Sequence, residues 1–325
     1  MEIGGYRELD LRTGLEYYGY AHPARLNMGR SGIYHAMRCL HCEKVLLPYY
    51  QCETVRDFLL KKGIQVQYYH IGEDMLPTDG NARKDTAIVV VNYFGLLSQR
   101  ELEAFANDNA NVIFDNTQGF YQPPIPGAYS VYSPRKFFGV PDGCYVIGEA
   151  AESFLDEYRQ DYSADTAQFL LQRIETGGNR NYSGYQQSEK RLEQADICRM
   201  SPLTYALLDN IDYRTIMKKR QQNYDFAAQR LGIINELSDA VFAREDTQVP
   251  MVYPLLVSHD ALRRVLKENE IFVGQWWKYL LEKPEISPFE RKLSRYLIPV
   301  QIDQRYGEKE IQWETDVIFQ ALAQC

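Results

Sequence analysis

The 325-residue sequence contains no apolar run long enough to cross a membrane, and its first residues, "MEIGGYRELDLRTG", lack the basic-then-apolar pattern of a secretory signal. Lysines and arginines form no basic stripe, and the net charge is -8, so a nucleic acid is not an expected partner. These absences predict a cytoplasmic protein with no membrane partner. They leave room for local positive sites that hold a small phosphorylated molecule.

Histidine and cysteine are also scarce, and neither forms the pattern of a metal site. The five histidines share no metal-ligand spacing, so no metal is predicted; they are His22, His35, His41, His70 and His259. The six cysteines are scattered through a long chain, which is typical of reduced cytosolic thiols. Cys39 and Cys42 do form a C-x-x-C, but it falls in a predicted helix without a second pair, which favours plain packing.

Helices and strands alternate through the first half of the chain. The segments "KVLLP", "IQVQYY", "TAIVVVNYFG", "NVIFD", "YSVYS" and "CYVIG" predict strands, several of them apolar on both faces. Between them, "RSGIYHAMRCL" and "ETVRDFLLKKG" carry apolar residues at helical spacing, and Ser98 and Glu101 predict a capping box for another helix. This order predicts an α/β domain with a mostly parallel sheet covered by helices.

The pattern changes after about residue 150. Polar helices are predicted at "AESFLDEYRQDY", "TAQFLLQRIETGG" and "YRTIMKKRQQNYDFAAQRLG". A strand, helix and strand are then predicted at "MVYPLLV", "HDALRRVLKENE" and "IFVGQWW", and "EKEIQWETDVIFQALA" predicts a final helix. We therefore expect a large α/β domain over residues 1–200 and a smaller C-terminal α+β domain over residues 201–325.

Three groups of candidate residues fall at the carboxyl ends of predicted strands, where open parallel sheets gather their ligands. Gly29, Arg30 and Ser31 precede the first helix, so the helix N-terminus could hold a phosphate. Asp115 ends the strand "NVIFD", and Lys136 follows the next strand in "VYSPRKFFGVPDG". Each group has a plain alternative: small residues often begin helices, strand-end acids often cap turns, and loop lysines are often only solvated.

Together, a phosphate cradle, a strand-end carboxylate and a lysine meet the needs of pyridoxal phosphate chemistry. Asp115 would keep the pyridine nitrogen protonated, which makes the cofactor ring an electron sink. Lys136 would hold the cofactor as a Schiff base and then shuttle the proton. Considered jointly, the three groups favour this chemistry over three unrelated structural roles.

The motifs around these residues resemble those of the fold-type I aminotransferases of the DegT/DnrJ/StrS class, which place amino groups on nucleotide-linked keto sugars. "NMGRSGIYHAM" is similar to the class's cofactor-phosphate helix, "VIFDNTQGF" to its "v-i-E-D-x-A-Q" strand, "YSPRKFFGVPDG" to its lysine loop and "ICRMSPLTYALL" to its "N-Y-R-M-S" segment. The resemblance implies that Asp115 is the ring-nitrogen acid, Gln118 a ring-contacting amide, Ser133 a phosphate-binding hydroxyl and Lys136 the Schiff-base lysine.

The same resemblance, which runs through most of residues 1–230, implies how the protein works. It implies a homodimer with shared active sites, in which the segment 176–200 crosses to the partner. It also implies an amino-acid donor, glutamate, and a small-molecule keto acceptor in polysaccharide or antibiotic sugar assembly.

Departures from the class concern the surroundings of the cofactor. Cys52 stands where the class offers an aromatic ring, so we expect Tyr50 or another residue to cover the cofactor. Asn92 replaces a frequent histidine, and Ile197 aligns with the asparagine that the partner subunit lends. Two alternatives therefore stay open: a non-catalytic scaffold with the pyridoxal phosphate fold, and a pyridoxal phosphate enzyme acting on a small keto acid.

Further residues are candidates for contact with substrate; they are Tyr6, Glu8, Arg199, Trp277 and Arg305. Tyr6 and Glu8 could equally form a plain edge strand. Of Trp276 and Trp277, one is expected in the core, and the other could face a sugar or nucleotide ring. Arg305 could clamp an anion or pair with Asp303 or Glu308.

Two features of the lysine loop carry expectations of their own. Arg135 would either lower the pKa of Lys136 by like charge or bind an anion. Gly139 to Gly143 would let the backbone turn close to the cofactor.

Overall fold

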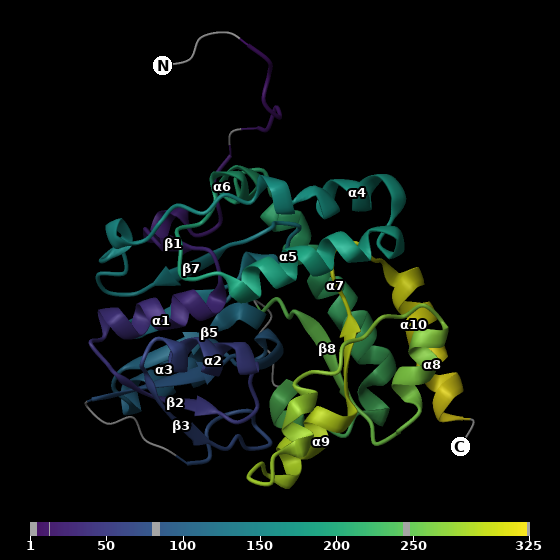
Figure 1. Cartoon of the computed structure of the whole chain (residues 1–325). Helices are drawn as coiled ribbons and strands as arrows, with labels where there is room; N and C mark the ends of the chain where they lie inside the picture. Colours follow the sequence, from purple (N-terminus) through teal and green to yellow (C-terminus); the bar gives the residue numbers. More distant parts are fainter. Residues whose placement is uncertain (1–4, 13, 80–84, 243–247, 324–325) are drawn as a thin grey trace.

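A main sheet of seven strands forms the centre of the structure (Figure 1). The structure is a computed structural model that describes residues 5–12, 14–79, 85–242 and 248–323. Seven strands lie in the order β1-β7-β6-β5-β4-β2-β3. They are β1 (Ala24–Leu26), β2 (Lys44–Pro48), β3 (Gln65–Tyr69), β4 (Thr86–Val91), β5 (Val112–Asp115), β6 (Tyr129–Tyr132) and β7 (Cys144–Ile147). The five strands from β3 to β6 in this order pair in parallel, whereas β7 is antiparallel to both β6 and β1. The predicted fold class, a mostly parallel α/β sheet, is confirmed.

Strand β4 shows how helices cover both faces of this sheet. Ala87 and Val89 belong to an apolar cluster with α1 (Gly29–Cys39) and α2 (Glu53–Lys61). Ile88 and Val90 point the other way, into a cluster that includes Leu102 of α3 (Gln99–Asp108). Every residue of β4 is buried, because helices cover both faces of the sheet. This burial on both sides explains why apolar residues follow one another along the strand instead of alternating with polar ones. The capping box of Ser98 and Glu101 at the start of α3 is also confirmed.

The C-terminal part adds a small antiparallel sheet. It consists of β8 (Val252–Leu256) and β9 (Leu297–Gln301). Its helices are α7 (Tyr213–Leu231), α8 (Leu262–Glu268), α9 (Pro288–Tyr296) and α10 (Glu308–Leu322). The apolar residues of β8 and β9 belong to the same cluster as Ile88 and Val90, so one core continues from the main sheet into this part.

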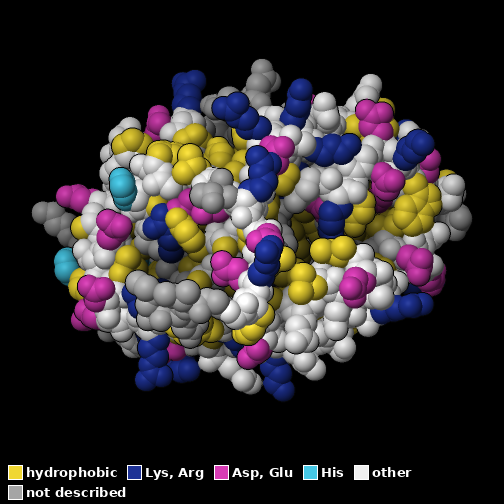
Figure 2. Space-filling view, turned by 90° about the horizontal axis from the view of Figure 1, so that it is seen from above, with side chains coloured by type: hydrophobic (Ala, Val, Ile, Leu, Met, Phe, Trp, Pro, Cys, Tyr) yellow, Lys and Arg dark blue, Asp and Glu magenta, His cyan; other side chains and the backbone are white. Residues whose placement is uncertain are grey.

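Three further helices lie together at the top of Figure 1: α4 (Gln168–Thr176), α5 (Tyr182–Gln194) and α6 (Pro202–Leu208). Figure 2 looks down on this end of the molecule, where charges of both signs are interspersed with apolar side chains. Within the described ranges, no helix combines the length and apolar character that a membrane crossing needs.

Two predicted elements are wrong. "AESFLDEYRQDY" forms turns and one short 3-10 turn, Leu155–Glu157, instead of a helix. Phe154 adopts a φ of +63° beneath the guanidinium of Arg38, and the Tyr158 hydroxyl contacts His35 on the same helix. These contacts to α1 hold the segment in an irregular shape that a helix could not match.

"IFVGQWW" is not a strand either. Trp276 stacks on Phe94, and Trp277 packs against Tyr50 with its own φ at +52°. A positive φ at a tryptophan is incompatible with an extended strand. The partner of β8 is instead "LIPVQ" (β9), which follows α9 without a loop and was missed for that reason.

Candidate active site

Thr117 is the point at which the three predicted groups meet. It lies in the short turn Asn116–Gln118, directly after Asp115 at the end of β5. The Lys136 Nζ donates a hydrogen bond to Thr117 Oγ1 at 2.9 Å. A Cβ added to Gly29, at the start of α1, would lie 2.9 Å from Thr117 Cγ2. The strand-end acid, the lysine and the helix N-terminus are therefore neighbours in space.

Lys136 combines access with a perturbed acidity. Its side chain is exposed to solvent at the end of the turn Pro134–Lys136, although protein encloses its amine on most sides. That enclosure lowers the pKa of the Lys136 ammonium, the charges of Asp115 and Cys52 oppose the shift, and Arg135 adds to it. The direction of the Arg135 effect is that of the like-charge alternative. A lowered pKa favours the neutral amine, which is the nucleophilic form.

Asp115 is buried and serves in part as the turn cap that its position suggested. Its Oδ1 accepts a hydrogen bond from the Thr117 backbone N–H at 3.0 Å. Among the described residues, its Oδ2 receives only a long contact from Gln51 Nε2, at 3.5 Å. One carboxylate oxygen is thus fixed by the fold, while the other is weakly held.

The first turn of α1 is a polar cradle without a capping side chain. Met28 at the N-cap offers no side-chain acceptor, and the first turn contains no acid, so the leading N–H groups lack a side-chain cap. The Ser31 Oγ is buried with no hydrogen-bond partner among the described residues. Gly32 is needed for close packing, because an added Cβ would lie 2.5 Å from Cys144 Sγ.

Arg30 differs from its prediction. Its guanidinium donates to the carbonyls of Leu192 and Glu193 at the end of α5, the latter at 3.0 Å. Burial lowers its pKa, and it lies over the ring of Phe58. The side chain predicted to bind the cofactor is therefore already engaged with α5.

The lysine loop is tied down on both sides of Lys136. Arg135 forms an ion pair with Glu189 of α5, and Ser133 is buried at the end of β6. Beyond Lys136, the fully buried Asp142 accepts from the Ser201 hydroxyl at 2.6 Å and from the Ser201 N–H at 2.8 Å. Gly143 has a φ of +123°, so it supplies the sharp turn; Gly139 has no positive φ.

Gln118 and Asn92 are buried and hold the adjoining backbone. Gln118 Oε1 accepts from the Phe94 N–H at 2.8 Å. Asn92 donates to Asn116 Oδ1 at 3.0 Å and accepts from the Leu97 N–H at 3.0 Å. Cys52 lies at the N-cap of α2, with its Sγ 3.1 Å from Thr54 Oγ1, and it contributes to the electrostatic surroundings of Lys136.

Tyr50 does not cover the site. Its ring is fully buried against Trp277, with centroids 4.3 Å apart, and it also packs on Tyr93. Trp276 and Trp277 both pack on this core and are partly buried. These aromatic residues form a wedge between the main sheet and the C-terminal part.

Among the described residues, the other substrate candidates make no hydrogen bond or ion pair with Lys136. Tyr6 is 99% exposed, Glu8 is exposed, and their segment leads away from the body in Figure 1. Arg305 makes the salt bridge to Asp303 that was the alternative, at 2.8 and 2.7 Å. The Arg199 carbonyl accepts a hydrogen bond from the Asp161 N–H at 3.0 Å, and the Arg199 Nε is buried without a described partner.

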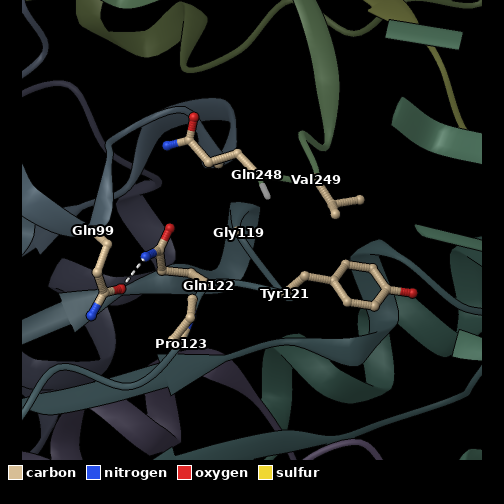
Figure 3. A pocket seen from close by; sticks show the side chains of 8 residues that line it. Gln99, Gly119, Tyr121, Gln122, Pro123, Gln248 and Val249 are labelled. Atoms are coloured by element: carbon tan, nitrogen blue, oxygen red, sulfur yellow. Dashed lines mark hydrogen bonds between the residues drawn. The ribbon is translucent and has the colours of Figure 1, made fainter. Parts of the chain in front are cut away.

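A separate small cavity of about 180 Å³ lies at Gly119, and Lys136 is not among its lining residues (Figure 3). It is lined by Gly95, Gln99, Gly119, Tyr121, Gln122, Pro123, Gln248 and Val249, none of which carries a formal charge. Its size is below that of typical ligand pockets, and the Gln122 and Gln99 amides bond to each other at 2.7 Å. In the described ranges, no group of three or more His, Cys, Asp or Glu residues could hold a metal ion.

Several residues of the site were not predicted from the sequence. Thr117 and Gln51 carry no motif of their own and are revealed only by their contacts with Lys136 and Asp115. Asp142 stands in the "GVPDG" segment of the lysine loop, but its burial could not be predicted. The hydroxyl groups that donate to it include those of Ser163 and Ser201, in distant segments.

No protein-family model matches the sequence, and no curated protein matches it. Solved structures do match. The sugar aminotransferase CalS13 from Micromonospora echinospora aligns with a TM-score of 0.61 and 15% identity, covering 92% of this chain and 87% of that one. A DegT/DnrJ/EryC1/StrS aminotransferase from Brucella abortus aligns at 0.59 and 13%, covering 93% and 87%.

NtdA from Bacillus subtilis, solved with its bound cofactor PMP, aligns at a TM-score of 0.61 and 12% identity, covering 94% of this chain and 75% of that one. Alignment over nearly the whole chain at such low identity fits a divergent sequence on a shared architecture. The chain has the fold of the DegT/DnrJ/StrS-type aminotransferases, a fold-type I α/β architecture.

Proposed function

We propose that this protein is a pyridoxal phosphate-dependent aminotransferase that moves an amino group from glutamate to a keto sugar carried on a nucleotide. The observation that carries the proposal is the meeting of Asp115, Lys136 and the first turn of α1 around Thr117. These are the acid, the amine and the anion cradle that this cofactor needs.

The residues fit the cofactor. The uncapped N–H groups of Gly29 to Ser31 and the partnerless Ser31 Oγ would hold its phosphate, with Ser133 nearby on the lysine loop. The weakly held Oδ2 of Asp115 would keep a proton on the pyridine nitrogen. When bound, the cofactor supplies a cationic ring that stabilises negative charge at the α-carbon of the substrate.

Lys136 would form the Schiff base and then serve as the proton shuttle. Its lowered pKa favours the neutral amine, and its Nζ donates to Thr117 Oγ1 beside the cradle of α1. The unpaired state of the five described cysteines supports a reducing compartment, so we place the protein in the cytoplasm.

We also propose a homodimer with shared active sites, in which α4 and α5 meet the partner. These helices leave several large apolar side chains exposed: Leu171, Ile174, Tyr182 and Tyr185. Exposed apolar residues that cluster on one hairpin mark an interaction surface. The same hairpin holds Arg30 and Arg135, so the interface would adjoin the cofactor phosphate.

A non-catalytic scaffold is the second candidate, and specific observations favour it. Cys52 offers no ring to stack on a cofactor, Tyr50 is buried elsewhere, and the Arg30 guanidinium is occupied by α5. A third candidate, an enzyme acting on a small keto acid, shares the cofactor chemistry and differs only in its acceptor.

Spectroscopy of the protein loaded with pyridoxal phosphate separates these candidates. We expect glutamate to replace the visible absorption band by the shorter-wavelength band of the amine form, and a nucleotide-linked keto sugar to restore the visible band. Restoration by a small keto acid alone would favour the third candidate. A spectrum that no amino donor changes would favour the scaffold.

A further inference from the structure

Phe137, the residue that follows Lys136, is held by the C-terminal part of the chain. Gln304 Nε2 donates to the Phe137 carbonyl at 2.7 Å, across 167 residues of sequence. The guanidinium of Arg220 lies 4.6 Å from the centroid of the Phe137 ring. Gln304 follows β9 and Arg220 lies on α7, so two distant elements meet on the neighbour of the lysine.

Arg220 is itself fixed in direction. It is 1% exposed, and its Nε donates to Gln304 Oε1 at 3.0 Å, while one terminal nitrogen donates to the Met251 carbonyl at 3.1 Å. Burial lowers its pKa to about 10, with the Asp303 carboxylate opposing the shift. A buried cation is a costly way to fill space, and an apolar side chain of the same size would do so more cheaply. What the arginine adds is a fixed direction for Gln304 and a cation over Phe137.

The two backbone groups of Phe137 have different partners. The N–H of Phe137 bonds within the turn, to the Pro134 carbonyl at 3.0 Å, whereas the Phe137 carbonyl takes its bond from Gln304. At the other end, the Lys136 Nζ reaches Thr117. The residue next to the lysine is therefore held by the C-terminal part, and the lysine amine is held by the main sheet.

We propose that Gln304 and Arg220 are positioning residues for Lys136, which hold its backbone so that the amine stays over Thr117 beside Asp115. The inference rests on the proposed role of Lys136 as the Schiff-base amine. Neither residue needs to touch the cofactor, so their effect would act through Phe137.

The test measures the Lys136 amine directly in cofactor-free protein. The rate at which acetic anhydride acetylates Lys136 is followed by peptide mass spectrometry as a function of pH, in wild type and in the variants Gln304→Met and Arg220→Met. Gln304→Met keeps the length of the side chain and removes both hydrogen bonds. The matched control is Arg230→Met on the same helix, which breaks bonds to Thr315 and Asp316 away from the lysine.

We expect the midpoint of acetylation to rise by about half a pH unit or more in Gln304→Met and Arg220→Met, because a loosened lysine escapes part of an enclosure that can shift amines by up to about 3–5 units. Cys52, Asp115 and Arg135, the charged or ionisable groups that perturb Lys136, remain in every variant. Arg230→Met should lower thermal stability without moving the midpoint. Should Arg220→Met fail to fold, Gln304→Met decides the matter.

A wild-type midpoint in Gln304→Met would overturn the proposal, as would an equal shift in Arg230→Met. The same proteins are then incubated with pyridoxal phosphate and borohydride. If wild-type Lys136 takes no label while the acetylation midpoints still shift, the proposed function fails and the positioning role stands.

Discussion

Asp115 joins a structural and a chemical role at a single residue. Its Oδ1 caps the turn that carries Thr117, and its Oδ2 accepts a long contact from Gln51. An amide keeps the capping oxygen but cannot hold a proton on a pyridine nitrogen. The two roles can therefore be separated by one substitution.

We predict that Asp115→Asn folds and binds pyridoxal phosphate but loses about 100-fold or more in turnover, the range seen when a group that governs protonation is removed. Thermal unfolding, cofactor absorbance and steady-state rates measure the three properties. Rates equal to wild type would mean that Asp115 is a turn cap and nothing else.

Gly32 tests the packing of α1 on the sheet. A Cβ there would lie 2.5 Å from Cys144 Sγ and 2.8 Å from Val131 Cγ1, so we predict that Gly32→Ala lowers the free energy of unfolding by about 1–3 kcal/mol. Gly232→Ala is the control, since Gly232 has a helical φ of -57° and open space around it. Denaturant unfolding should show the control unchanged or slightly stabilised; equal losses in both variants would refute the packing argument.

The predictability of the site differs from residue to residue. Asp115 and Lys136 could be found because strand ends in a parallel sheet converge on one edge. The engagement of Arg30 by α5 and the burial of Tyr50 by Trp277 could not, because each depends on a partner more than 150 residues away in the chain. Sequence spacing carries no information on such contacts.

At the scale of elements, the strands of the main sheet were predictable and the irregular segments were not. Buried parallel strands such as "TAIVVV" are apolar on both faces, and the start of α3 is predicted by its capping box. "IFVGQWW" has strand-like composition, yet its tryptophans wedge against Phe94 and Tyr50. Apolar and aromatic residues are found both in strands and in irregular segments that pack on a core, so composition alone does not distinguish the two.

Helix α10 carries a buried carboxyl that makes stability depend on pH. Burial raises the pKa of Glu314 to about 8 from its ordinary 4.5, the Gln301 N–H opposes the shift, and Asp303 adds to it. Between these values the folded chain holds a proton that the unfolded chain has released, so stability falls as pH rises from about 5 to 8. We predict that Glu314→Gln removes most of this decline, as measured by unfolding at several pH values. A decline of equal slope in the variant would show that other groups cause it.

At the scale of the whole molecule, one core links the main sheet to β8 and β9, and the α4–α5 hairpin remains outside it. Its apolar side chains are exposed in the single chain, which the proposed dimer would explain. A two-fold contact is the commonest way to close such a surface.

We predict a dimer by light scattering, and a shift toward monomer in Ile174→Glu, because a charge placed in an apolar interface must be desolvated. The control is Ile233→Glu in the 3-10 turn Gly232–Ile234 that follows α7. Ile233 is 92% exposed and Ile174 is 84% exposed, so the two sites are matched in residue type and access. A monomeric wild-type protein that holds its full load of cofactor would exclude shared active sites.

The central claim is that Lys136 is the amine that binds pyridoxal phosphate. The most direct measurement incubates the protein with pyridoxal phosphate, reduces it with borohydride and locates the stable label by peptide mass spectrometry. We predict one label for each chain, on Lys136, and none in Lys136→Ala. A fully loaded protein with its label on another lysine, or with no label, would contradict the account.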